Sequence, residues 1–404
     1  MDKFEAEKAI ESLRFGTPPE GHVLEFTVGR ESEIGTLTAR LKAEGATPRR
    51  KSSRALLINA NWGSGKSHLL QVVREVALKN SFAISLIEVD SRAGVRFNRM
   101  DTIFGAVCRD LETPRSSSAG VGNLFEAYAN ASTNLVPGTL GLRGELSDQG
   151  KWNYSEVLQS PAMFVALRAW ISAGKSGNAE TRSRIIDWLA NPSEYRTRRK
   201  ELYMELIEQQ RNHFRDPRPE FKFYADDVFG FHSAGHRQSW DGLADLDLIA
   251  KLAGLRGLVL LVDEFEDVIQ NLTRVDYKQA AFWNLFHLFR GEDFPGQAYF
   301  AVTPEFVSKC KQALMDKGVY DYDFSQFDRL QKFQMDPIEA NQLFDLARRI
   351  RQTHATAYGW NAASQVSDLE LKKLCETLVS SSVPDRMRQA IVAVVKLLDE
   401  RSQR

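Results

Sequence analysis

The stretch from residue 60 to residue 67 contains the residue types that bind a triphosphate. Glycines let successive backbone N–H groups surround an anion, a lysine reaches the β and γ phosphates, and a hydroxyl ligates Mg²⁺. Lys66 and Ser67 complete a near match to the pattern G-x-x-x-x-G-K-[ST], with Ala60 in place of its first glycine. We therefore expect phosphates to contact the loop and the first helical turn, which comprise Asn61, Trp62, Gly63, Ser64, Gly65, Lys66, Ser67 and His68.

The flanking sequence favours this interpretation over a chance glycine-rich turn. The apolar run 55–58 predicts a buried strand before the loop, and apolar residues spaced three and four apart over 69–77 predict a helix after it. A strand before the loop and a helix after it are what phosphate binding requires. His68 is expected to pack beside this turn rather than to act in the chemistry.

Two acids follow a second apolar run, which ends at residue 262. Asp263 and Glu264 come at the carboxyl end of this expected strand, where open α/β sheets bind ligands. We expect Asp263 to hold Mg²⁺ together with the Ser67 hydroxyl, and Glu264 to act as the general base that polarises the attacking water. The alternative is a strand that runs into an acidic helix start. We interpret the next two acids, Glu266 and Asp267, as helix N-terminal charges.

A third apolar strand is expected over 298–303, and it ends in the hydroxyl residue Thr303. A polar side chain there could lie between the two acids and sense the γ phosphate. The alternative is a threonine that caps the following helix.

These elements alternate in the manner of a parallel sheet. The strand–loop–helix–strand unit up to residue 89 is repeated by the helix 242–255, the strand 257–263, the helix 276–290 and the strand 298–303. The fold class expected is α/β, with a parallel-sheet core of the P-loop NTPase type. We expect four segments, namely a first part of the core (1–114), a large and mostly helical insertion (115–240), a second part of the core (241–335) and a C-terminal helical lid (336–404).

Composition narrows the class of protein. Lys and Arg number 53 and so do Asp and Glu, so a uniformly basic nucleic-acid coat is excluded. The three cysteines, Cys108, Cys310 and Cys375, are far apart and odd in number, which argues against a disulfide framework. No apolar run reaches the roughly 18 residues needed to cross a bilayer, so we expect no membrane contact and a cytoplasmic location.

Taken in this order, the motifs resemble the AAA+ branch of P-loop ATPases. The run VGRESEI (28–34) is similar to the nucleotide-framing segment of that branch, which implies that Gly29 and Arg30 border the nucleotide. More closely, the stretches 61–111, GLVLLVDEFEDV (257–268) and FPGQAYFAVTPEF (294–306) resemble the ATP-binding proteins of BREX-type anti-phage systems of bacteria. The resemblance implies ATP and Mg²⁺ as ligands, ATP hydrolysis, and a role in defence.

The AAA+ resemblance also implies that arginines complete the site. Arg329, just before an expected strand at 332–335, resembles an arginine finger that a subunit lends to its neighbour, and Lys66 and this arginine would both stabilise charge on the γ phosphoryl group. In the lid, Arg388 rather than Arg386 resembles the sensor arginine that meets the nucleotide. An ordinary surface arginine is the alternative at both positions.

The resemblance implies a homo-oligomer and partner proteins from the same operon, of helicase or nuclease type. Basic clusters around 92–99 and 196–218 could add contact with DNA, although most charge runs are solvated faces. Two other functions stay open. The chain could be a nucleotide-gated switch or scaffold with negligible hydrolysis, or a DNA-loading ATPase of the origin-recognition type.

Overall fold

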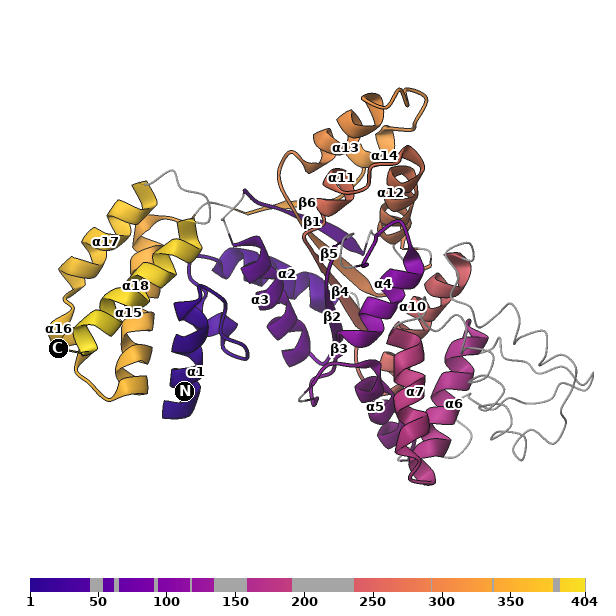
Figure 1. Ribbon diagram of the computed structural model, residues 1–404, viewed down its shortest axis with the longest axis horizontal. Coiled ribbons are helices and arrows are strands. Elements are labelled where there is room, and N and C mark those ends of the chain that lie inside the picture. Colours follow the sequence, from indigo (N-terminus) through magenta and orange to yellow (C-terminus); the bar gives the residue numbers. More distant parts are fainter. Residues whose placement is uncertain are drawn as a thin grey trace, which may run out of the picture.

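The computed structural model describes most of the chain. The described residues are 1–43, 54–61, 65–90, 94–116, 118–133, 158–190, 236–291, 293–335, 338–380 and 386–403. Trp62, Gly63 and Ser64, the long basic cluster at 196–218 and Arg92 lie outside them. Figure 1 shows a central sheet with helices on both sides and a separate group of C-terminal helices next to the N-terminal helix.

The sheet has six strands in the order β3-β2-β4-β5-β1-β6. Their bounds are β1 Ala55–Asn59, β2 Ala83–Glu88, β3 Leu111–Glu112, β4 Leu258–Asp263, β5 Gln297–Val302 and β6 Lys332–Gln334. Every pairing between these described strands is parallel except that of β3, which runs antiparallel to β2 at one edge. The expected strands are therefore confirmed. The two-residue β3 was not expected, and it makes the sheet mostly rather than wholly parallel.

Alternate residues of the strands belong to two different hydrophobic cores, because successive side chains of a strand point to opposite faces of the sheet. Leu57 and Phe300 belong to the core on one face, whereas Leu56, Ile58 and Tyr299 belong to the core on the other. Strands buried on both faces read as continuous apolar runs. This is why the sequence around β1, β4 and β5 shows no alternation of polar and apolar residues.

One face of the sheet is covered by the short helix η1 (Val23–Phe26) and by α2 (Glu31–Ala43) and α3 (Lys66–Lys79). The other face is covered by α4 (Met100–Arg109), α10 (His236–Leu252) and α12 (Val275–Arg290). The fold is therefore a three-layer α/β/α sandwich.

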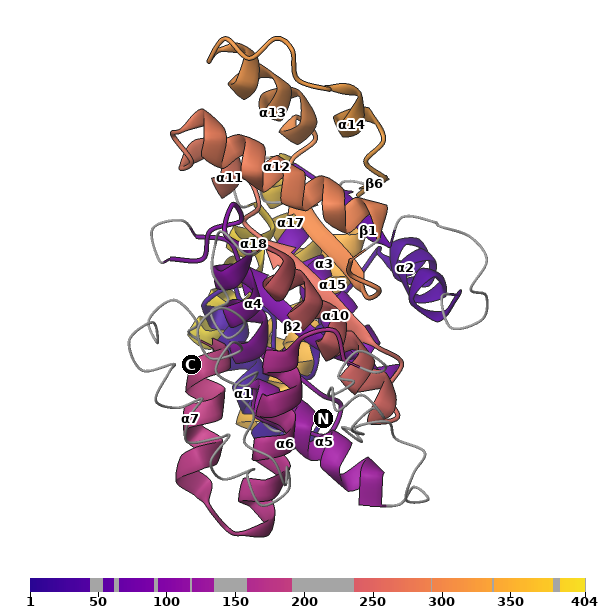
Figure 2. The same cartoon turned by 90° about the vertical axis from the view of Figure 1, so that its right-hand side faces the viewer.

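Beyond α4 and α10 lie the helices of the segment 115–240. They are α5 (Val121–Thr133), α6 (Pro161–Lys175) and α7 (Ala179–Ala190). Their apolar residues share one core with the sheet, and both views show them together at the end of the molecule opposite α13 (Figures 1 and 2). The described part of this segment is thus helical and continuous with the main core. The short helices α11 (Asp267–Gln270), α13 (Phe306–Met315) and α14 (Ser325–Asp328) complete that other end.

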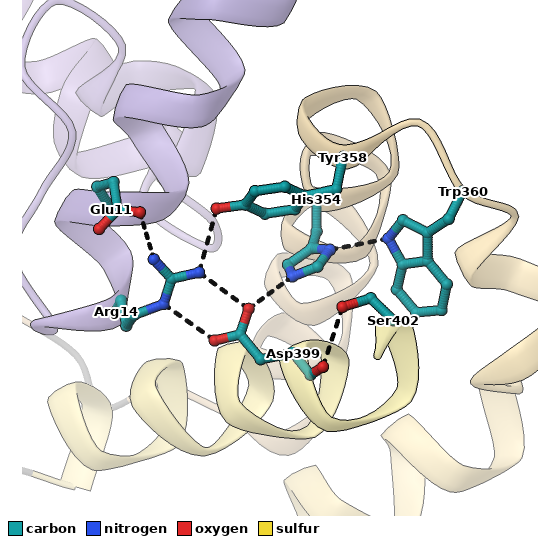
Figure 3. A network of polar contacts seen from close by, with 7 residues as sticks. All are labelled: Glu11, Arg14, His354, Tyr358, Trp360, Asp399 and Ser402. Atoms are coloured by element: carbon teal, nitrogen blue, oxygen red, sulfur yellow. Dashed lines mark hydrogen bonds and ion pairs between the residues drawn. The ribbon is translucent and has the colours of Figure 1, made fainter. Parts of the chain in front are cut away.

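The C-terminal helices form a third core. They are α15 (Ala340–Tyr358), α16 (Ala362–Gln365), α17 (Asp368–Ser380) and α18 (Arg386–Ser402). The N-terminal helix α1 (Lys3–Arg14), grouped above with the first part of the ATPase core, packs against α15 and α18. Buried Ile10 and Leu13 of α1 share this core with Leu343 and Leu346 of α15. A polar network joins the same helices (Figure 3).

Candidate functional site

Three of the expected functional segments meet at one edge of the sheet. Strand β5 pairs in parallel with β1 on one side and with β4 on the other. The segments that follow these three strands, namely the phosphate-binding loop, the two acids and Thr303, therefore leave the sheet at the same edge. This is the edge at which open α/β sheets bind ligands.

The end of the loop has the geometry of an anion site. Gly65 is the N-cap of α3, with φ at +90°, and no side chain caps the helix. That backbone angle lies in the left-handed region, which glycine adopts without steric cost. Lys66 and Ser67 form the first turn of this 14-residue helix. A helix N-terminus presents free N–H groups and partial positive charge, which favour a phosphate.

Lys66 is already in contact with a carboxylate. Its Nζ lies 3.4 Å from Oε1 of Glu266, and the two side chains are only 11% and 6% exposed. The same Glu266 oxygen accepts a hydrogen bond from the backbone N–H of Thr303. Glu266 therefore ties the lysine of the loop to the end of β5.

This contact differs from the interpretation of Glu266 as a helix N-terminal charge. Glu266 does precede α11, yet its side chain makes no cap hydrogen bond to that helix. The acidic run at 263–267 gives no periodic signal that distinguishes the inward-facing acid from its neighbours. The order of strands in the sheet explains why Glu266 reaches Lys66. The segment after β4 lies next to the end of β5, and β1, which precedes the phosphate-binding loop, lies on the other side of β5.

Phe265 fixes the positions of the acids on either side of it. Its ring is fully buried; it packs edge-on against Phe97, with ring centroids 4.6 Å apart, and at a tilt of 59° against Phe300 of β5, with centroids 4.9 Å apart. Glu264, on one side, has a φ of +51°, an uncommon angle for a residue with a side chain. Its backbone N–H donates to Oδ1 of Asp263 at 2.9 Å.

The pKa of Glu264 is raised above its usual range. Loss of solvent around the carboxylate is the main cause, and the negative charges of Asp263 and Glu266 add to it, whereas Lys66 opposes it. A carboxyl with a raised pKa holds a proton more strongly, which suits a general base that must accept one from water.

A cavity of about 440 Å³ opens beside these groups. Its polar lining includes Gly65, Lys66, Ser67 and Glu264. Its apolar part comes from the N-terminal segment, the chain after β6 and the C-terminal helices: Leu13, Phe26, Val28, Met335, Ile338, Leu346, Met387 and Ile391. The volume is in the range of small-molecule sites, and a mostly apolar lining with a few charged groups suits a nucleotide.

His68 lies on the wall of this cavity in the neutral form. Its Nε2 is 2.8 Å from Oγ1 of Thr27, and burial together with the charge of Arg30 lowers its pKa to about 4. Arg30 is itself buried and pairs with Glu33 at 2.7 Å. His68 thus packs against the N-terminal segment, and Arg30 borders the cavity beside it.

A family model, the BREX system ATP-binding protein BrxC/D, matches residues 1–207 and 233–403. The chain belongs to this family. No curated protein and no solved structure matches it. The BREX resemblance drawn from the motifs is therefore confirmed, and the family indicates ATP binding and a role in anti-phage defence. None of the described helices is long and apolar enough to cross a membrane.

Within this BREX family member, the expected site residues fall into two groups. Those that line the cavity are Gly65, Lys66, Ser67, His68, Arg30, Glu264 and, from α18, Arg388. Arg388 lies across Gly16 and donates from Nε to the Phe15 carbonyl at 3.2 Å. Lys66 and Glu264 come from the segments around the sheet and Arg388 from the C-terminal helices, so the cavity lies between these two parts.

The second group does not line the cavity. Gly29 has a φ of +62°, and the side chain of Gln342 packs against it. Arg329 is exposed at the end of α14, 3.3 Å from the Ser325 hydroxyl. Asn61 follows β1 and Asp263 is the last residue of β4, and neither lines the cavity. Thr303 is buried, and its Oγ1 has no hydrogen-bond partner among the described residues.

The oxygen donors expected to hold magnesium are of the chemical kinds that Mg²⁺ prefers, namely a hydroxyl at Ser67 and a carboxylate at Asp263. The described residues contain no group of three or more histidine, cysteine or acidic side chains placed to hold a metal. Mg²⁺ in nucleotide sites commonly takes only one or two protein ligands and completes its shell with phosphates and water. Ser67, on the cavity wall, and Asp263, next to Glu264, are the protein groups that would hold it.

Proposed function

We propose that this protein is a Mg²⁺-dependent ATPase of the AAA+ type, which couples its nucleotide state to assembly with partner proteins of a BREX system. One observation carries the proposal. The end of the phosphate-binding loop, an acid with a raised pKa and an arginine of the C-terminal helices all line one cavity. Their charges suit a bound triphosphate, and their common cavity supports the proposal.

In this proposal Lys66 and the free N–H groups at the start of α3 bind the β and γ phosphates. Ser67 and Asp263 would hold Mg²⁺, which neutralises charge on those phosphates when it is bound. The apolar residues of the N-terminal segment and the lid would pack against the adenine ring of ATP. A small number of charged groups in the cavity therefore orients the ligand.

Glu264 is the proposed general base. It takes a proton from the water that attacks the γ phosphate, and Lys66 stabilises the charge that develops on the transferred group. The strained backbone at Glu264 supports this role, because strained residues occur often at functional sites. Thr303 is the proposed γ-phosphate sensor, since its buried hydroxyl has no hydrogen-bond partner among the described residues and can accept or donate a new hydrogen bond.

Through Arg388, the position of the lid would depend on which nucleotide is bound. An arginine that contacts the phosphates of ATP better than those of ADP biases the position of the lid by the difference in binding energy. The helices α15, α17 and α18 share one core with α1, so they would move as a unit. Such a movement is how ATP binding would change the surface that partner proteins meet.

The test is the substitution Glu264→Gln, which keeps the size and removes the basic carboxylate. We expect ATP binding to persist and phosphate release to fall by roughly 10²- to 10⁴-fold. Glu305→Gln is the matched control, because Glu305 follows the neighbouring strand β5, is exposed and has no proposed role. It should leave the rate nearly unchanged.

Other results would support the alternative functions. If wild-type protein binds ATP and releases no phosphate, the chain is a nucleotide-gated switch. If duplex DNA stimulates hydrolysis severalfold, a DNA-loading role gains support, whereas an unchanged rate with and without duplex argues against it.

A further inference from the structure

The buried acid Glu266 has no role in the hydrolysis scheme, yet it contacts two of the groups in that scheme. We propose that Glu266 is an internal anion that holds Lys66 in the absence of nucleotide, and that the phosphates of the nucleotide replace it. This inference rests on the proposed nucleotide site and assigns to it a residue that restrains binding.

The contact with Lys66 carries the first step. The ammonium and the carboxylate are 3.4 Å apart, and both side chains are almost completely buried. Charges removed from water interact strongly, and a buried charge that loses its partner is strongly destabilised. A phosphate that takes Lys66 must therefore compete with Glu266, and the observed affinity is weakened by that competition.

The contact with Thr303 carries the second step. The Thr303 N–H donates to the same carboxylate oxygen that meets Lys66. The lysine that reaches the phosphates and the residue proposed to sense them are thus held by one oxygen atom. When phosphate draws Lys66 away, Glu266 loses its cation, and the hydrogen bond to the end of β5 changes with it.

Local helix capping does not account for this acid. Glu266 precedes α11, a helix of four residues, and makes no side-chain cap bond to it. The next acid along the chain, Asp267, instead contacts Asn271 of the same short helix. The two neighbouring acids therefore have different partners: Asp267 contacts a residue of α11, and Glu266 contacts Lys66 of the phosphate-binding loop.

The experiment compares equilibrium binding of ATP, ADP and AMP to the full chain and to Glu266→Gln. We expect ATP and ADP to bind roughly 3- to 30-fold more tightly to the variant, because Lys66 no longer has to leave a carboxylate. AMP should bind equally to both, since the lysine of such a loop reaches the β and γ phosphates. The dependence on phosphate number is a result that a purely structural role would not produce.

Asp267→Asn is the matched control, because it removes one negative charge from the adjacent position. It should leave the affinity for ATP within about twofold of wild type, so that a general charge effect is separated from the contact with Lys66. Should Glu266→Gln not fold, Glu266→Asp keeps the charge and shortens its reach, and a smaller gain for ATP and ADP is expected.

Unchanged or weaker ATP binding in a folded Glu266 variant would overturn this inference. That failure is distinct from failure of the proposed function. If the wild-type chain binds no ATP, the ATPase proposal itself is wrong. If wild type binds ATP and Glu266→Gln behaves like Asp267→Asn, only the role of Glu266 is wrong.

Discussion

Arg14 and Asp399, 385 residues apart in the chain, form a two-point ion pair that joins the first helix to the last. Arg14 donates from Nε and from Nη2 to the two Asp399 oxygens, each at 2.9 Å. Asp399 also meets Nε2 of the fully buried His354 at 2.9 Å, and Trp360 Nε1 donates to Nδ1 of the same ring (Figure 3). The indole N–H requires an acceptor at Nδ1, so Nε2 of His354 carries the hydrogen.

This network predicts that α1 is held to the C-terminal helices through Asp399. We expect Asp399→Ala to lower the free energy of unfolding by about 1–3 kcal/mol, because it leaves the buried His354 N–H without its acceptor and removes two of the hydrogen bonds of Arg14. Glu400→Ala, at the adjacent exposed position, should change it by less than about 0.5 kcal/mol. Urea unfolding of the two variants checks this, and equal losses would contradict it.

Lys66→Ala is expected to weaken ATP binding by at least about 100-fold, because the variant loses the only side-chain cation proposed to reach the phosphates from α3. Lys79→Ala, in the last turn of the same helix and largely exposed, is the control and should bind ATP as wild type does. The measurement is calorimetric titration. Strong ATP binding by Lys66→Ala would mean that the loop does not hold the phosphates.

Arg388→Ala tests the lid. The side chain lines the cavity from α18, and we expect its loss to weaken ATP binding roughly tenfold, the usual size of a lost charge-assisted hydrogen bond. Lys396→Ala, exposed on the same helix, controls for the removal of a positive charge. If Arg388→Ala binds ATP as tightly as Lys396→Ala does, Arg388 is an ordinary surface arginine.

Arg329 is exposed and lines no part of the cavity of its own chain, so its proposed role requires a neighbouring subunit. Arg329→Ala should bind ATP normally and lose most phosphate release. Mixing it with Glu264→Gln, itself inactive, should restore part of the rate, because some mixed sites combine an intact Glu264 with an intact Arg329. Lys309→Ala, exposed on α13, is the control. A mixture as inactive as its components argues against a shared site.

The lowered pKa of His68 predicts a loss of stability in acid. The folded protein binds this proton only near pH 4, whereas the unfolded chain binds it near pH 6.5. The contribution of His68 to the free energy of unfolding is therefore fully present above pH 6.5. It is lost as the pH falls toward 4, at up to about 1.4 kcal/mol per pH unit. His68→Gln should flatten this part of the curve of unfolding free energy against pH. The same slope in both proteins would show that other groups are responsible.

The sequence alone determined the parts of this protein that depend on local spacing. The apolar runs at β1, β4 and β5, the glycine and lysine at the start of α3 and the acids after β4 could all be recognised, because strand burial and helix N-termini leave short, periodic patterns. The motifs also led to the BREX family, which the family match confirmed. The roles of the individual site residues remain predictions.

Which distant residues come into contact is seen in the folded structure and not in the local sequence. Nothing in the acidic run shows that Glu266 faces Lys66, 200 positions earlier, or that α1 packs with α15 and α18 rather than with the sheet. Such contacts depend on the order of strands and on how apolar faces find partners across the whole chain. Local patterns carry no information about that order, since the same strand and helix signals are compatible with several arrangements.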